Sequence, residues 1–321
     1  MELFHKVNVD WLGKKWYFLG FSLIFSIAGL FSMLFWHHVP LGVDFKGGTL
    51  VYVSFPQQPN DDHIRAALHE GGIRNERVQR ISGNVAANDA AANQVVISVP
   101  ETNDANHDAA REQIKTALAN NYHDSGFIIQ QTDIVGPTAG AQLTRQAGWA
   151  VLWSLLGMLV YLWFRFEFIY GAAAVIAVFH DTLITIGFFS LLNTEITLTV
   201  VAAILTLVGY SMNDTIVVFD RIRENLQTMR RATLSDVVNT SINQTLSRTI
   251  LTSGLTFLTV LSLFIFGGEV LHGFSLALVI GILIGTYSSI AVAAPMLVAW
   301  TDWRASKGKR TSLPSTNRVT A

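Results

Sequence analysis

The chain has 321 residues and a formal net charge of −1, and only 14% of its residues are charged whereas 50% are hydrophobic. A soluble domain carries about 25% charged residues, so this chain has too little charge to cover a water-facing surface of its size. With a mean hydropathy of +0.39, the composition excludes a simple soluble enzyme, a disordered protein and a coiled coil.

Six stretches are long and apolar enough to cross a bilayer, because a transmembrane helix needs about 20 mainly apolar residues. The first, 17–36, follows an amino-terminal arm, 1–16, and its length and its lack of a cleavage site favour a retained anchor over a signal peptide. The other five are predicted at 148–164, 168–192, 196–219, 246–266 and 274–300, within residues 144–303. Pro295 is expected to kink or end the sixth helix.

The distribution of Lys and Arg predicts that both chain termini are cytoplasmic. Basic residues occur in the arm, in the links after the second and fourth spans and in the tail 304–321, whereas the links 193–195 and 267–273 have none. The basic tail is interpreted as a topology determinant, with an anionic-lipid or ribosome contact as the alternative. Residues 37–143 are then expected outside the cytoplasmic membrane.

The polar segment 37–143 is predicted to form a small α+β domain. Residue patterns predict strands at 48–55, 77–81, 94–99 and 127–134, and helices at 60–70 and 106–122. The stretch 83–93, rich in Ala and Asn, is expected to be a mobile loop. The order βαββαβ is typical of a ferredoxin-like split βαβ fold. No carboxylate pair or nucleophile–base spacing occurs here, so the segment is interpreted as a binding or mechanical module.

Ionisable residues inside membrane spans are costly and usually functional. Asp181 lies near the middle of the third predicted span, and Asp214 lies near the cytoplasmic end of the fourth. Arg248 is in the first turn of the fifth span, which runs antiparallel to the fourth, so Asp214 and Arg248 are expected to form an ion pair. A carboxylate that alternates between a cation and a proton is the chemistry of a proton relay. The alternative is a static pair that fixes helix register.

Polar neighbours favour the relay, because hydroxyl and amide groups around Asp214 and Arg248 indicate access to water. Asp181 is expected to hydrogen-bond a nearby hydroxyl such as that of Thr185, and His180 is interpreted as a packing residue. The GxxxG spacing at 281–285 predicts close helix contact. The supporting polar residues are Asn213, Thr215, Ser247, Thr249 and Thr252.

Several motifs resemble the SecD/SecF family of the RND superfamily. The segment 43–49, just after the first span, is similar to the family's D-F-x-G-G-T element, and the segments 177–181, 208–225 and 239–249 resemble other family motifs in the same order. Paired glycines permit unusual backbone angles. The element is interpreted either as a joint that transmits span movement to the outer domain or as a tight turn before the first strand. Its matching residues are Asp44, Phe45, Gly47, Gly48 and Thr49, with Lys46 at the variable position.

The resemblance implies a six-span half-transporter in the bacterial inner membrane, with 37–143 in the periplasm. It implies that SecD completes a twelve-span unit at the SecYEG channel, that YajC and membrane lipid are further partners, and that exported unfolded polypeptide is the substrate. Asp214 and Arg248 would take part in proton passage, with Asp181 second. The near-neutral charge implies no nucleic-acid partner, and no cofactor is expected.

Three functions remain open. The leading one is a proton-coupled accessory subunit of protein export. The second is a structural partner that stabilises SecD and the channel without using proton flow. The third is an RND-type small-molecule exporter, although the short outer domain offers little room for a substrate pocket. A membrane enzyme is the least favoured, because the sequence has no catalytic constellation, no cysteine and no HxxxH or HExxH metal-binding spacing.

Overall fold

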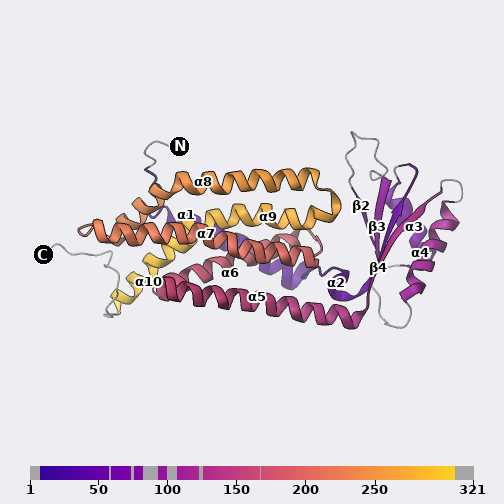
Figure 1. The fold of residues 1–321 in the computed structure, drawn as a ribbon, viewed down its shortest axis with the longest axis horizontal. Helices are drawn as coiled ribbons and strands as arrows, with labels where there is room; N and C mark the ends of the chain where they lie inside the picture. The colour runs from indigo at the N-terminus through magenta and orange to yellow at the C-terminus, as the bar shows by residue number, and fades with distance from the viewer. Residues whose placement is uncertain are drawn as a thin grey trace.

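The computed structural model describes residues 8–57, 59–73, 76–81, 93–99, 107–122, 126–166 and 168–307. It is elongated, with a bundle of long helices at one end and a smaller sheet-and-helix domain at the other (Figure 1). The predicted mobile loop lies outside the described residues apart from Asn93, as do residues 1–7 of the arm and 308–321 of the basic tail.

Within the described residues, six helical stretches are long and apolar enough to cross a membrane, which confirms the predicted six spans. Four of them, the second, fourth, fifth and sixth, extend well beyond their predicted apolar windows because the helix continues into more polar sequence. The fifth span, for example, begins at a capping box in which Thr233 and Asp236 satisfy each other's backbone N–H groups. The bundle helices are α1 Lys15–Phe31 with the π-helix η1 Ser32–Trp36, α5 Pro137–Arg165, α6 Phe168–Leu191, α7 Leu198–Thr228, α8 Leu234–Phe266, and α9 Gly268–Ser288 with η3 Ser289–Ala293 and α10 Ala294–Ser306.

The sixth span changes its helical form where the sequence predicts a disturbance. Helix α9 passes through the π-helical turn η3 into α10, and Pro295 lies in the first turn of α10. Proline has no N–H to donate to the preceding turn, so the wider π-helical turn lies where a regular helix would lose a hydrogen bond.

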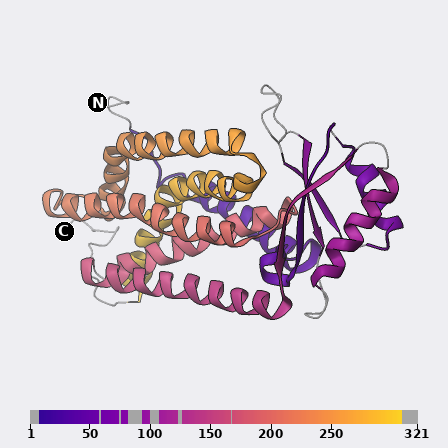
Figure 2. The same ribbon diagram turned by 45° about the vertical axis from the view of Figure 1, so that its right-hand side comes forward.

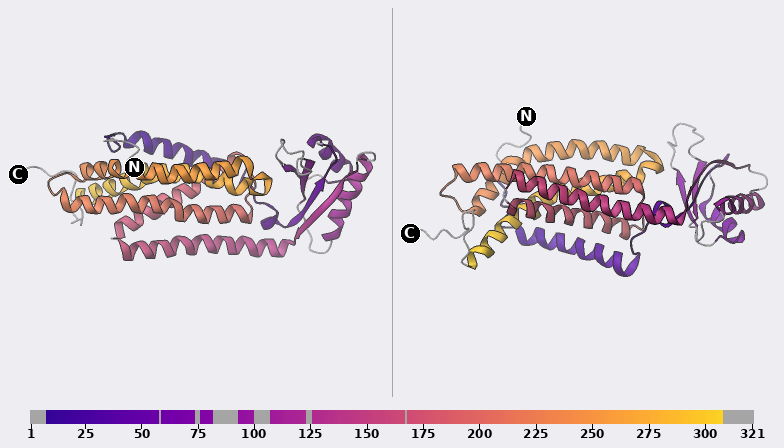
Figure 3. Two further views of the ribbon diagram at one scale, coloured as in Figure 1. Left: turned by 45° about the horizontal axis from the view of Figure 1, so that its top comes forward. Right: turned by 60° about the horizontal axis from the view of Figure 1, so that its bottom comes forward.

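The helices approach closely where they have glycines. A Cβ atom on Gly285 would lie 2.9 Å from Cβ of Ser211, and one on Gly281 would lie 2.5 Å from the Leu207 side chain. The GxxxG spacing of α9 therefore packs against α7 of the same chain. A second glycine contact, between Gly29 and Gly187, joins α1 to α6, and α1 runs along the outside of the bundle (Figure 3).

The outer domain has four strands, β1 Gly48–Ser54, β2 Arg77–Ile81, β3 Gln94–Val99 and β4 Ile128–Val135, in the order β2-β3-β1-β4. All neighbouring strands are antiparallel. Helices α3 Asp61–Glu70 and α4 His107–Asn121 cover the face of the sheet that points away from the bundle (Figures 1 and 2). The elements follow the predicted order, and the domain has its own core of buried aliphatic side chains, which includes Val51, Val53, Ile64, Ile97 and Leu118.

Candidate functional site

Asp181 lies in α6 and is completely buried. One carboxylate oxygen accepts a hydrogen bond from Oγ of Ser211 in α7, at 2.6 Å, and the other lies 3.0 Å from Nδ1 of His180. The expected bond from Thr185 to this carboxylate is wrong. The Thr185 hydroxyl donates instead to the main-chain oxygen of Asp181, at 2.8 Å, as hydroxyls four residues later in a helix commonly do.

His180, interpreted from the sequence as a packing residue, contacts the neighbouring acid. Its Nδ1 contacts the Asp181 carboxylate, whereas its Nε2 is buried and has no hydrogen-bond partner among the described residues. His180 therefore adds an imidazole to the polar cluster around Asp181.

Asp214 lies in α7 and is 2% exposed. Its Oδ2 accepts a hydrogen bond from Oγ of Ser253 in α8, at 2.6 Å. Ser211 and Asp214 are three residues apart in α7 and therefore share one face of that helix. Polar side chains thus run from α6 to α8 through α7 in the order His180, Asp181, Ser211, Asp214 and Ser253.

The predicted ion pair between Asp214 and Arg248 is absent. Both residues are described, no N–O distance of 4.0 Å or less joins them, and the Arg248 side chain is exposed. Arg248 is not in the first turn of its helix, because α8 begins at Leu234. Ser253, which does face Asp214, follows five residues later, and at 3.6 residues per turn the two positions lie about 140° apart around the helix.

The five supporting polar residues separate into two sets. Thr215 and Thr249 are buried, and the Thr249 hydroxyl has no partner among the described atoms. Ser247 is half-buried, whereas Asn213 and Thr252 are exposed beside Arg248. In α8, the Thr252 hydroxyl donates a hydrogen bond to the main-chain oxygen of Arg248 at 3.0 Å, so these two exposed residues lie on one side of that helix.

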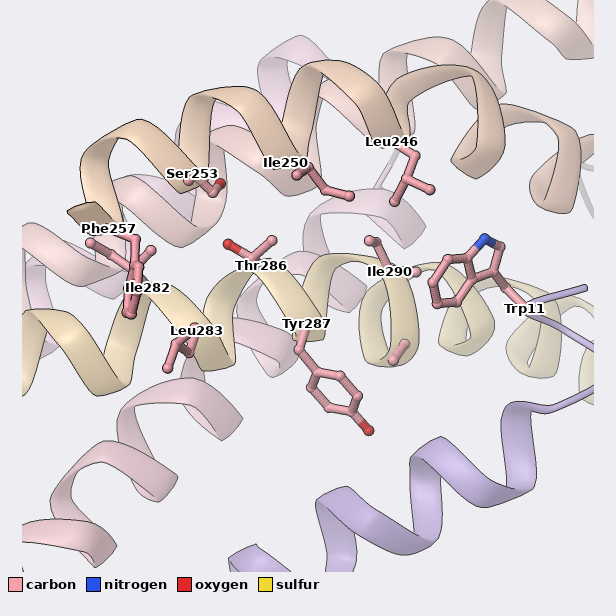
Figure 4. A pocket seen from close by; sticks show the side chains of 12 residues that line it. Trp11, Leu246, Ile250, Ser253, Phe257, Ile282, Leu283, Thr286, Tyr287 and Ile290 are labelled. Atoms are coloured by element: carbon pink, nitrogen blue, oxygen red, sulfur yellow. The ribbon is translucent and has the colours of Figure 1, made fainter. Parts of the chain in front are cut away.

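An apolar groove includes Ser253, the hydrogen-bond donor to Asp214, in its lining (Figure 4). It has a volume of about 370 Å³, lies between α8 and α9, and is closed at one end by Trp11. Ser253 is part of its wall, and the remaining lining is mostly aliphatic and aromatic. Because the lining is apolar, this groove does not supply the access to water that the sequence indicates for Asp214.

The D-F-x-G-G-T element ties the outer domain to the helix that contains Asp214. Oδ2 of Asp44 accepts a hydrogen bond from the backbone N–H of Leu198, the first residue of α7, at 2.8 Å. A carboxylate at this position satisfies a free N–H group and interacts favourably with the helix dipole. Phe45 packs in the buried cluster that also contains Val200 and Ala203 of α7.

The two glycines of this element are required by geometry. Gly47 has φ +79° and Gly48 has φ +152°, values that favour glycine. A Cβ atom on Gly47 would also lie only 2.8 Å from the backbone of Pro137. Thr49, the last residue of the element, is buried at the start of β1. The element is therefore both a tight turn into β1 and a physical connection to α7.

Sequence reasoning missed an ion pair between the outer domain and the bundle. Nη1 of Arg77 in β2 lies 3.0 Å from Oε1 of Glu195, in the short link between α6 and α7. Burial raises the pKa of the Glu195 carboxyl above its ordinary value, while Arg77 and Lys46 nearby oppose the increase and Asp44 adds to it. The sequence signal that could have pointed to this pair is Glu195 itself, an acidic residue in a short link that has no basic residue.

Comparison with known proteins gives consistent matches. The family model described as protein export membrane protein SecD/SecF, C-terminal, matches residues 113–303. The protein translocase subunit SecF of Koribacter versatilis is 52% identical, over 96% of this chain and 95% of its own length. The same subunit of Calditerrivibrio nitroreducens is 41% identical, over 90% of this chain and 93% of its own length.

Two solved structures are also similar. The crystal structure of SecDF, a translocon-associated membrane protein from Thermus thermophilus, has a TM-score of 0.79 at 34% identity and covers 92% of this chain. A structure of SecDF in a super-membrane-facing form has a TM-score of 0.69 at 35% identity and covers 95% of this chain. This chain spans 39% and 40% of those two chains, about two fifths of each.

Proposed function

Because the chain belongs to the SecD/SecF family of protein export membrane proteins, we propose that it works with SecD to assist export of unfolded polypeptide through the SecYEG channel. Proton flow through the helical bundle drives movement of the outer domain, which acts on the emerging polypeptide. Proton-dependent movement is the part of this proposal that the experiment below tests. YajC and membrane lipid are the further proposed partners.

The observation that carries the proposal is the position of Asp214. Its carboxylate is buried inside a helix long and apolar enough to span a membrane, accepts a hydrogen bond from one hydroxyl, and has no cation within ion-pair distance among the described residues. Such a carboxylate is a candidate proton carrier. It lies in α7, whose outer end is capped by Asp44 of the D-F-x-G-G-T element, so a change in the position of α7 would reach the outer domain. Asp181 and His180 form the second part of the pathway.

The exposed Arg248 supports the participation of SecD in the site. A guanidinium that faces hydrocarbon is costly, and Arg248 is exposed, as are Thr252 in the same helix and Asn213 in α7. Solved SecDF chains are more than twice as long as this one. We infer that the membrane helices of SecD cover these exposed residues and that Arg248 takes part in proton passage at the boundary between the two proteins.

The remaining parts of the arrangement are proposed as follows. Both termini are cytoplasmic, and residues 37–143 lie in the periplasm of a bacterial inner membrane. The start of α1 and the end of α10 lie at the end of the bundle opposite the sheet, which supports this orientation (Figure 1). The outer domain has a ferredoxin-like fold. The strand order β2-β3-β1-β4, with antiparallel neighbours and both helices on one face, supports that assignment.

Export into membrane vesicles with D214N tests the function. The proton-gradient-dependent part of export should be lost, while the variant still co-purifies with SecD. D220N is the matched control, because Asp220 is an exposed acid in the same helix, paired with Arg165, and its export should keep the gradient dependence. If D214N supports gradient-dependent export at the parent rate, the proton role of Asp214 is wrong.

The structural-partner function rests on a specific observation as well. The bonds from Ser211 to Asp181 and from Ser253 to Asp214 each join two helices, which is what a purely stabilising role would require. Under that function D214N reduces the yield or thermal stability of the SecD complex, and export per assembled complex stays unchanged with and without a proton gradient.

A further inference from the structure

The outer domain is attached to the bundle through two neighbouring glycine connections. Gly47 and Gly48 join α2 (Val43–Lys46) to β1, and Gly136 joins β4 to α5. The two connections touch, since a Cβ atom on Gly47 would lie 2.8 Å from Pro137. Glycine leaves the backbone free to change its dihedral angles, so this pair of connections, which we call the hinge, permits the whole domain to rotate as a unit.

A cleft of about 210 Å³ separates the sheet from the outer end of the bundle. One wall is the face of the sheet that has no helices, with Tyr52, Gln79 and Val96. The other wall belongs to the bundle and includes Glu195 and His272. The lining mixes apolar side chains with polar ones such as Gln79, Thr199 and Glu195. Because the walls are already separated by this open space, moving them further apart exposes little additional apolar surface at the cleft.

The ion pair between Arg77 and Glu195 bridges the sheet and the bundle at this cleft. Its side chains are 30% and 18% exposed. Nη2 of Arg77 also lies 3.4 Å from the main-chain oxygen of Asn193, in the same link. Partly exposed ion pairs contribute little stability, about 1 kcal/mol or less. This contact is therefore strong enough to favour one position of the domain and weak enough to break repeatedly.

We propose that Arg77 and Glu195 form a latch that holds the outer domain docked on the outer ends of α6 and α7, and that the domain rotates about the hinge when the latch opens. Glu195 lies three residues before Leu198, the start of α7, and Asp44 caps that start. A shift of α7 thus alters the latch and the cap together. The use of this latch in export rests on the proposed function, whereas the docked and open positions exist without proton flow.

Because the chain has no cysteine, one introduced thiol is the only cysteine of this chain and its labelling, measured on the separated chain, reports docking. Val96 is 8% exposed and lines the cleft, whereas its neighbour Val95 is fully buried in the core beneath α3 and α4. The experiment measures maleimide labelling of V96C in the intact chain with SecD in membranes, without a proton gradient or an exported polypeptide. V95C is the matched control for unfolding of the domain.

Adding R77Q to V96C should raise the labelling rate about two- to fivefold, the range expected when a weak ion pair is lost. The same change added to V95C should leave that thiol protected. E195Q should also raise the labelling rate, but by less than R77Q, because Arg77 then keeps its contact with Asn193. The double variant R77Q/E195Q should be no more open than R77Q alone, because both changes remove the same ion pair.

Two results would overturn the latch. One is a labelling rate of V96C that R77Q leaves unchanged. The other is additive effects of R77Q and E195Q, which would mean that the two side chains act separately. Neither result depends on proton flow. If the latch fails this test while D214N abolishes gradient-dependent export, the latch is wrong and the proposed function stands. If D214N exports normally with a gradient while R77Q still raises the labelling of V96C, the latch stands and the proposed function is wrong.

Discussion

The two buried acids of the bundle have different partners. Asp181 has a hydroxyl and an imidazole, whereas Asp214 has one hydroxyl, that of Ser253. The sequence identifies both acids, because charged residues inside apolar windows are rare. It does not identify their partners, since these come from other helices and depend on helix rotation. Ser211 and Ser253 are ordinary serines in the sequence, and Arg248 is conspicuous there but faces outward.

Glu195 gives a pH dependence that can be measured. Its pKa is raised above the usual 4.5 by burial, despite Arg77 and Lys46 and with a contribution from Asp44. A raised carboxyl pKa means that the folded chain holds this proton more tightly than the unfolded chain. The stabilisation is therefore complete below pH 4.5 and is lost as the pH rises through the raised value.

The prediction for E195Q follows from that sign. As the pH is raised from 4.5 to neutrality, the thermal midpoint of the parent should decrease relative to that of E195Q, because the amide of E195Q does not titrate. Other carboxyl groups titrate in both proteins, so the measured quantity is the difference between the two midpoints as a function of pH. A difference that is constant with pH, or that changes in the other direction, would contradict the assignment.

At the scale of elements, the positions of the helix ends determine how the bundle contacts the outer domain. The apolar windows predict six spans but not where the helices stop, because polar residues extend α7 and α8 well beyond the hydrophobic stretch. The strands and helices of the outer domain were predicted within a few residues, since alternation and caps are local signals. The Arg77–Glu195 pair was not, because it joins residues 118 positions apart.

The cap of α7 predicts a difference between two substitutions of Asp44. D44A removes the acceptor for the Leu198 N–H and should reduce stability by about 0.5–2 kcal/mol, whereas D44N retains an acceptor and should lose only the charge interaction with the helix. Thermal unfolding of the complex measures this: the midpoint temperature should be lowest for D44A, higher for D44N and highest for the parent. Equal losses for both variants would show that the hydrogen bond is not what matters at this position.

The contact between α7 and α9 predicts a second pair of variants. G285A places a Cβ atom 2.9 Å from Cβ of Ser211 and should force the helices apart, at a cost of about 1–3 kcal/mol. G209A is the matched control in α7, where a Cβ atom would have no neighbour within 4 Å. That change should be neutral or slightly stabilising because alanine favours the helix. If G285A and G209A have nearly the same thermal midpoint, close packing at Gly285 is contradicted.

At the scale of the whole molecule, α7 connects the membrane site to the outer domain. It contains Asp214, it begins at the Asp44 cap, and it follows directly on the link that contains Glu195. A proton that crosses 100 mV provides about 2.3 kcal/mol, whereas a partly exposed ion pair contributes about 1 kcal/mol or less. One proton is therefore sufficient to bias the latch, but movement of a long polypeptide would need repeated cycles.

Maleimide labelling of V96C under an imposed proton gradient tests this coupling most directly. The account predicts that the gradient changes the labelling rate when Asp214 is present and has no effect when D214N is added, while V95C stays protected in both cases. A labelling rate that responds to the gradient equally with and without D214N would contradict the account.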